Sequence, residues 1–256
     1  MKMCQSDLSK LRRGETLDTI FQGRLKIIQP QQGYRFSIDA VLLAGLTLVR
    51  PQDRIVDLGT GCGIVPLLLA SQQSVKHITG IEIQESLVSM AKRNVLINGF
   101  EQFISIVQAD LRGLEVTRAG GPKDLVVCNP PYGKLRSGRL SPNSSKAIAR
   151  HELLATLADV VRTAAQLLHQ KGRLAVIYPA RRLVNLLAEV NSGGFAPKRL
   201  TLIHSTLDGE ARLVHLESVK GGGEELQVNK PFAIYGSDGN YTEEMQAMYG
   251  NGPAVF

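Results

Sequence analysis

The chain has few cysteines and no long hydrophobic run. Its three cysteines, Cys4, Cys62 and Cys128, are odd in number and far apart. This pattern argues against a disulfide framework and a C-x-x-C metal or redox site, and it suits a reducing cytoplasm. The longest apolar run, residues 40–49, is about half of the ~20 residues that a membrane helix needs, and residues 1–15 contain no signal-peptide core. We therefore expect a cytoplasmic protein without a membrane span.

The chain also lacks internal repeats, low-complexity tracts and metal-ligand spacing. Its five histidines form no H-x-x-x-H pair and lie at no ligand spacing from a cysteine, so we expect no metal site. Residues 219–225 are rich in glycine but lack the G-x-x-x-x-G-K-[ST] pattern of a phosphate-binding P-loop. These absences argue against solenoid repeats, zinc sites and P-loop enzymes.

Basic residues outnumber acidic residues in this chain. Lys plus Arg number 30 against 23 Asp plus Glu, which gives a formal charge of +7 and a pI near 9.4. A basic chain favours a polyanionic partner through long-range attraction. The alternative is a soluble protein that is merely basic. Nothing in the sequence indicates an oligomeric state.

Short strands alternate with helices along most of the chain. Five apolar or β-branched runs end in polar or turn residues, as buried strands do: residues 54–59, 77–83, 103–110, 124–129 and 173–179. Helical segments lie between them at residues 64–71, 85–97 and 151–170, the last closed by Lys171 and Gly172. This order predicts an α/β fold with a parallel, doubly wound sheet.

The two ends of the chain differ from this alternation. A helix at residues 180–191 precedes two strands, residues 198–205 and 211–220, which predict an antiparallel pair at one edge of the sheet. At the front, a short β element and a helix form an N-terminal extension, residues 1–50, packed on a main domain of residues 51–256. The tail from Lys230, with its Pro, Gly and Asp, is expected to be a surface segment.

A glycine loop follows the first strand of the main domain. Asp57 ends the strand, and Gly59, Gly61 and Gly63 open the next helix. Such glycines allow positive φ and a close approach of backbone N–H groups to a ligand. The dinucleotide fingerprint would need a third glycine at position 64, which is Ile64, so NAD or FAD fits poorly. The loop resembles the S-adenosylmethionine (AdoMet) loop of Rossmann-like methyltransferases; the alternative is a tight structural turn.

Acids at further strand ends support AdoMet as the cofactor. Glu82 lies at the end of the second strand, where it can accept the ribose hydroxyls, and Asp110 ends the third, where it can accept the adenine amine. Asp57 would lie near the cofactor's amino group. Each acid alone could be an exposed strand-end carboxylate. The predicted cofactor set comprises Asp57, Gly59, Thr60, Gly61, Gly63, Glu82, Ile83, Asp110, Leu111 and Asn129, and the family resemblance described below adds Asp39.

The fourth strand ends in Asn129, Pro130, Pro131 and Tyr132. Two prolines remove two N–H donors, so this corner presents oxygen acceptors that can hold a planar amine with its lone pair towards a methyl donor. Tyr132 would stack on an extruded base. The motif resembles that of methyltransferases acting on adenine N6, guanine N2 or a protein glutamine. The alternative is a proline-terminated strand with a tyrosine packed in a loop, and Cys128 is expected in the core rather than as a nucleophile.

A basic loop begins at the same corner. Residues 133–150 contain no acid and five cations that could contact a phosphate backbone: Lys134, Arg136, Arg139, Lys146 and Arg150. The alternative is solvated loop charge.

Nearly the whole chain resembles one family. The stretches "QPQQGYRFSIDAVLLAGL", "NPPYGK", "KRLTLIHSTLDGEARLVHLESVKGG" and "IYGSDGNYT" are similar to the bacterial tRNA (adenine-N6)-methyltransferases that modify adenine 37 of a valine tRNA. The resemblance implies a Rossmann-like class I methyltransferase with a mostly parallel seven-stranded sheet, AdoMet as cofactor and tRNA as partner. It also implies that Phe36 and Asp39 line or close the cofactor pocket. An rRNA guanine-N2 or protein-glutamine methyltransferase, and a non-catalytic AdoMet-binding RNA protein, remain open alternatives.

Overall fold

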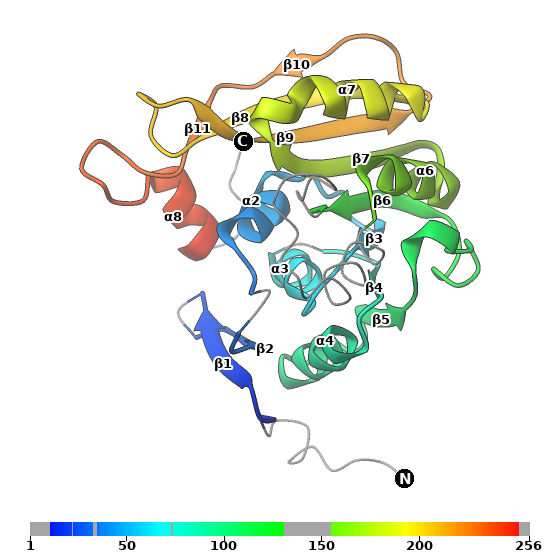
Figure 1. Ribbon diagram of the computed structural model, residues 1–256, viewed down its shortest axis with the longest axis vertical. Helices are drawn as coiled ribbons and strands as arrows, with labels where there is room; N and C mark the ends of the chain where they lie inside the picture. The colour runs from blue at the N-terminus through cyan, green and yellow to red at the C-terminus, as the bar shows by residue number, and fades with distance from the viewer. Residues whose placement is uncertain (1–10, 22, 33–34, 73, 131–154, 251–256) are drawn as a thin grey trace, which may run out of the picture.

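A twisted sheet forms the centre of the molecule in the computed structural model, which describes residues 11–21, 23–32, 35–72, 74–130 and 155–250 (Figure 1). Within these ranges the sheet has nine strands. Their order places β5 (Ile104–Gln108), β4 (His77–Glu82), β3 (Arg54–Leu58), β6 (Lys123–Cys128) and β7 (Leu168–Pro179) side by side and parallel. This confirms the predicted parallel sheet.

An antiparallel hairpin extends the sheet beyond β7. β9 (Ala211–Lys220) pairs antiparallel with both β7 and β8 (Phe195–His204), as the sequence predicts. Two short strands, β10 (Gln227–Val228) and β11 (Phe232–Ala233), pair parallel with β8 and were not predicted. The seven expected strands are therefore confirmed, with two short additions at the edge.

Helices cover both faces of the sheet. α2 (Ile38–Leu46), α3 (Ile64–Gln72) and α4 (Glu85–Ile97) pack on one face, and α6 (Leu157–Leu167) and α7 (Leu183–Ser192) on the other (Figure 1). Successive strand residues divide between the two cores, since Ile55 belongs to the first and Val56 to the second. This explains the continuous apolar runs of the sequence, because strands buried on both faces have no solvent side.

The N-terminal segment forms a hairpin of its own. β1 (Glu15–Ile20) and β2 (Leu25–Pro30) pair antiparallel in a separate sheet, and β2 contacts α4. Ile27 and Ile28 of β2 are fully buried and join the same core as α2 and α3. The division of the chain into two parts at residue 50 stays a prediction.

The helix before β7 is shorter than predicted. α6 begins at Leu157, where Thr156 and Asp159 form a capping box, and it ends at Leu167. Residues 168–170 belong instead to β7, because buried Leu168 pairs with Lys123 of β6. Lys171 takes a left-handed conformation with φ 67° inside this strand. The predicted helix end at Lys171 and Gly172 is therefore wrong.

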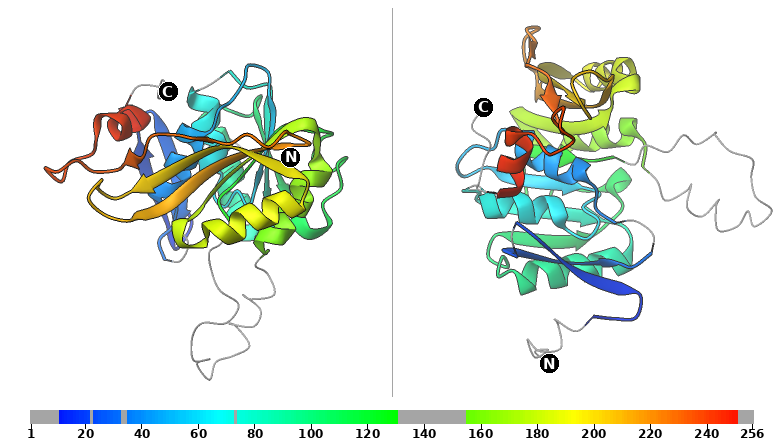
Figure 2. Two further views of the ribbon diagram at one scale, coloured as in Figure 1. Left: turned by 90° about the horizontal axis from the view of Figure 1, so that it is seen from above. Right: turned by 90° about the vertical axis from the view of Figure 1, so that its left-hand side faces the viewer.

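The C-terminal tail is not a surface segment. Phe232, Ile234, Met245 and Met248 are buried in the first core, the two methionines on α8 (Glu243–Gly250). α8 lies against α2 (Figure 2). The missing side chain of Gly45 in α2 leaves room for Met248. The prediction failed because it weighed the Pro, Gly and Asp of this stretch and not its four apolar anchors.

No helix in the described ranges has both the length and the apolar character needed to cross a membrane.

The buried tail leads to a stability prediction. Met245 is fully buried, so Met245→Ala should lower the free energy of unfolding by about 2–5 kcal/mol, as core truncations of this size do. Urea denaturation followed by circular dichroism measures this. The control is Glu244→Ala, whose exposed carboxylate forms a 3.7 Å ion pair with Lys230 and whose loss should cost under about 0.5 kcal/mol. Equal, small effects of both variants would contradict the packing described.

Candidate active site

Four of the predicted site residues lie at one edge of the sheet. β3, β4, β5 and β6 are neighbours and parallel, so their carboxyl ends share this edge. The register places Asp57 opposite Gly80 and Glu82 opposite Gln108, while Asp110 and Asn129 follow the ends of β5 and β6. The arrangement is that of ligand sites in open α/β sheets, which lie outside the carboxyl ends of strands.

The glycine loop folds back over the end of β4. Gly59, Gly61 and Gly63 have φ values of 78°, 59° and 83°, a left-handed region that side-chain-bearing residues rarely adopt. The N–H groups of Gly59 and Thr60 both donate to the carbonyl of Ile81 at 2.9 Å. A Cβ on Gly80 would lie 2.9 Å from the Thr60 side chain, so this glycine of β4 makes room for the loop.

The Glu82 carboxylate holds the loop in place. Its Oε2 accepts from the Gly61 N–H at 3.0 Å, and its Oε1 accepts from the N–H groups of Ile83 (3.0 Å) and Gln84 (2.9 Å). The side chain is buried. A carboxylate has about four acceptor positions, so one is left for a ligand hydroxyl. The sequence predicts the ligand role but not this contact with the loop.

Asp57 is the least compensated acid at this edge. It is 2% exposed, and its Oδ2 has no hydrogen-bond partner among the described residues. Burial raises the pKa of Asp57 to about 7, although the nearby Thr60 side chain acts to lower it, and repulsion from the Glu82 carboxylate adds to the rise. A buried acceptor next to a second acid favours a positively charged ligand group, such as the ammonium of an amino acid moiety.

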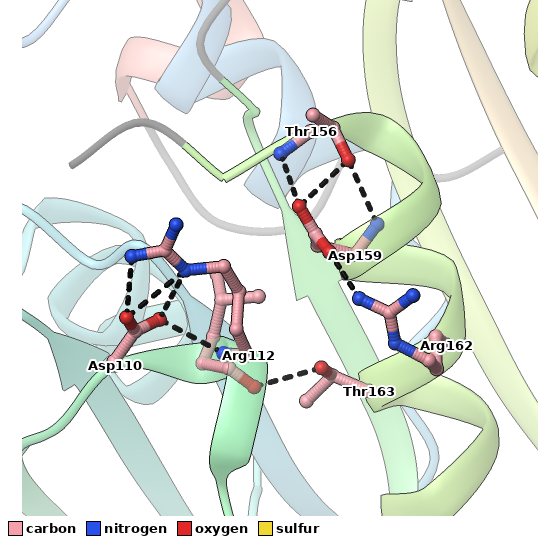
Figure 3. A network of polar contacts seen from close by, with 7 residues as sticks. Asp110, Arg112, Thr156, Asp159, Arg162 and Thr163 are labelled. Atoms are coloured by element: carbon pink, nitrogen blue, oxygen red, sulfur yellow. Dashed lines mark hydrogen bonds and ion pairs between the residues drawn. The ribbon is translucent and has the colours of Figure 1, made fainter. Parts of the chain in front are cut away.

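Asp110 is already paired (Figure 3). It caps the short helix η1 (Leu111–Gly113) by accepting from the Arg112 N–H at 2.9 Å, and its Oδ2 accepts from the Arg112 guanidinium at 2.6 Å. The hydrogen bonds from Arg112 lower the pKa of Asp110. Thr163 of α6 donates to the Leu111 carbonyl at 2.8 Å and ties η1 to that helix. Sequence reasoning missed Arg112, although its position two residues after Asp110 could have indicated the pair.

The acceptor corner follows β6. Asn129 is half-buried and has an interaction partner, and Pro130 is buried. Cys128 is in the core, as predicted: its Sγ donates to the Leu58 carbonyl at 3.1 Å, and burial raises the pKa of the thiol well above its usual range. A thiol of this kind is inert as a nucleophile.

Two residues implied by resemblance lie at the start of α2. Phe36 packs against the first core, and its N–H donates to Gln29 Oε1 at 3.2 Å. Asp39 is in the first turn of the helix, half-buried and with a partner. Their roles at a cofactor pocket stay predictions.

The remaining predicted residues lie outside the described ranges: Pro131, Tyr132, Lys134, Arg136, Arg139, Lys146 and Arg150.

The fold and the loop define a class of protein. A solved structure of a predicted O-methyltransferase from Agrobacterium tumefaciens superposes on 85% of this chain and 98% of its own, with a TM-score of 0.68 and 24% sequence identity. At this identity the likeness shows the fold alone. The chain has the Rossmann-like architecture of the class I methyltransferases.

Comparison with sequence families is more specific. The model of the methyltransferase small domain matches residues 38–189, more than half of the chain, and the protein belongs to this family. A curated relative from Porphyromonas gingivalis, named tRNA1(Val) (adenine(37)-N6)-methyltransferase, is 31% identical over 71% of this chain and 73% of its own. A protein of the same name from Tolumonas auensis is 29% identical over 68% and 71%.

Membership of this family makes the protein an AdoMet-dependent methyltransferase. The residues present fit the cofactor. The unpaired Asp57 carboxylate oxygen suits the ammonium of the methionine moiety, and Glu82 retains acceptor capacity for the ribose. The three left-handed glycines of the loop carry no side chains that would keep a ligand away from their backbone N–H groups.

The raised pKa of Asp57 predicts a pH dependence of stability. The folded pKa of about 7 lies above the unfolded value of 3.8, so the folded state holds an extra proton between these values. The associated stability is complete below pH 4 and is lost as the pH rises through 7, at up to about 1.4 kcal/mol per pH unit. Urea unfolding of the ligand-free protein and of Asp57→Asn, across this range, should show a steeper fall for the parent. If the unfolding free energies of the two proteins changed equally with pH, the pKa of Asp57 would not be raised.

Proposed function

We propose that the protein transfers the methyl group of AdoMet to the N6 amino group of an adenine in tRNA, adenine 37 of a valine tRNA being the position named for its relatives. One observation carries the proposal. Asn129 and Pro130 follow β6, the strand next to β3, at the same edge as the glycine loop. An acceptor corner next to a methyl-donor site is suited to an amine substrate.

The chemistry follows from the acceptors at this corner. The Asn129 side-chain oxygen and the Pro130 carbonyl would accept the two hydrogens of the adenine amine. These hydrogen bonds favour a tetrahedral nitrogen whose lone pair points at the methyl carbon. The new N–C bond forms as the S–C bond breaks, the sulfur keeps the bonding electron pair, and the nitrogen then loses a proton. The products are N6-methyladenine and S-adenosylhomocysteine.

The remaining roles are proposals of the same kind. Asp57 would bind the cofactor's ammonium, Glu82 its ribose, and Asp110 its adenine amine, which would share that carboxylate with Arg112. Thr60, Ile83, Leu111 and Asp39 would line the same pocket. Tyr132 would stack on the target base, and the basic residues of the 133–150 loop would contact phosphates. A formal charge of +7 supports a nucleic-acid substrate, and the cytoplasm is the expected location.

Three alternatives make different predictions. A protein-glutamine methyltransferase would use the same corner, but its activity would survive ribonuclease treatment of the substrate. An rRNA guanine-N2 methyltransferase would label guanine and not adenine. A non-catalytic AdoMet-binding protein would bind RNA with a steep salt dependence and would transfer no label to it. The names of the curated relatives favour tRNA.

Replacement of Asn129 tests the proposal directly. Asn129→Ala removes one acceptor for the amine, so kcat for tRNA methylation should fall by about 100-fold or more while the Kd for AdoMet stays nearly unchanged. Asn129→Asp keeps an acceptor oxygen at the same place and is the matched control, which should retain more activity than the alanine variant. Turnover by Asn129→Ala at the parent rate would show that the amine is not held here.

A further inference from the structure

Asn94 of α4 and Asn98, the residue that caps the C-terminal end of this helix, bind the free edge of the N-terminal hairpin. Asn94 Oδ1 accepts from the Ile28 N–H at 2.7 Å, and its Nδ2 donates to the Ile28 carbonyl at 2.8 Å. Asn98, one helical turn later, does the same with Lys26 at 2.9 and 2.7 Å. Four helical residues rise about 6 Å and two strand residues about 6.6 Å, so the two spacings match. The asparagine amides thus continue the hydrogen-bond ladder of β2.

The third hydrogen bond of each asparagine differs. Asn98 Nδ2 donates to the Asn94 carbonyl of its own helix at 2.7 Å. Asn94 Nδ2 donates instead to the carbonyl of Cys62 at 2.9 Å, inside the glycine loop, and Asn94 is fully buried. Only Asn94 of the pair therefore connects the hairpin to the loop.

This contact restrains the second half of the loop, residues 61–63. In the described part of the chain, the two side chains that hydrogen-bond the backbone of residues 61–63 are Glu82, at Gly61, and Asn94, at Cys62. The Gly63 N–H is bonded within the loop, to the Thr60 carbonyl. In the proposed function Glu82 would also accept a ribose hydroxyl at its remaining acceptor position. The contacts of Asn94 in the described part of the chain are all to protein backbone, at Ile28 and Cys62.

The hairpin is firmly held against α4. Arg93, next to Asn94, forms a two-pronged ion pair with Glu15 of β1, and both side chains are 5% exposed. Burial alone would raise the pKa of Glu15, but the hydrogen bonds from Arg93 hold it below its usual range. Arg12 donates to Ser89 of the same helix at 3.0 Å. The hairpin lies outside residues 38–189, the span of the family model.

We propose that Asn94 is a positioning residue for the cofactor loop, and that the N-terminal hairpin is part of the AdoMet site through this side chain. The proposal rests on the proposed use of the glycine loop for AdoMet. By fixing the Cys62 carbonyl, Asn94 fixes the peptide between two left-handed glycines and holds the loop ready before the ligand arrives. Preorganisation of this kind raises affinity by removing an ordering cost.

The test compares Asn94→Ala with Asn98→Ala. Both variants lose two hydrogen bonds to β2, so both should lower the thermal midpoint. Asn94→Ala alone should raise the KM for AdoMet, about tenfold, with kcat at saturating AdoMet and the KM for tRNA changed less than about twofold. Assays run well below both melting midpoints. An equal effect of the two variants on the KM for AdoMet would overturn the proposal.

Two further variants make the result decisive. If Asn94→Ala does not fold, Asn94→Ser, which leaves room for a water beside Ile28, is judged by the same criterion. Glu82→Gln tests the site itself and should weaken AdoMet binding measured by calorimetry. A loss with Glu82→Gln but none with the Asn94 variants overturns this inference alone. No loss with either variant overturns the assignment of the loop as the cofactor site.

Discussion

The Glu82 carboxylate determines the form of the site. It ends β4 with three backbone hydrogen bonds, one to the glycine loop at Gly61 and two to the start of the connection to α4. Without a buried acceptor at this point, three N–H groups at the carboxyl edge would lack a partner, at a cost of about 1–3 kcal/mol each. The loop, the start of α4 and the candidate ribose position therefore depend on one side chain.

A second acid near Glu82 makes this edge of the sheet favourable for a positively charged ligand group. Asp57 is buried, and both its burial and the Glu82 charge raise its pKa to about 7. Arg112 pairs with Asp110, and backbone N–H groups satisfy three acceptor positions of Glu82, whereas Asp57 Oδ2 has no hydrogen-bond partner among the described residues. A ligand that carries an ammonium and a diol would relieve this repulsion. The site is thus more suited to AdoMet than to a dinucleotide, whose pyrophosphate would add negative charge.

The sequence predicts the elements whose signal is local. Strands such as residues 54–58 and 77–82 are found because they are apolar on both faces, and the acids at their ends follow from the parallel order. The sequence does not predict contacts between residues that are far apart in the chain. Leu168 belongs to β7 because it pairs with Lys123, and Met248 is buried because Gly45 leaves space for it. Asn94 hydrogen-bonds Ile28 and Cys62, which lie far from it in the chain. No local pattern marks these partners.

In the proposed reaction an adenine amine in tRNA accepts the methyl group next to Asn129. The most direct measurement incubates the protein with methyl-labelled AdoMet and tRNA lacking modifications, digests the RNA to nucleosides and separates them. We expect label in N6-methyladenosine, with a single modified position that maps to adenine 37 of a valine tRNA. Label in any other nucleoside, or none in RNA, would contradict it.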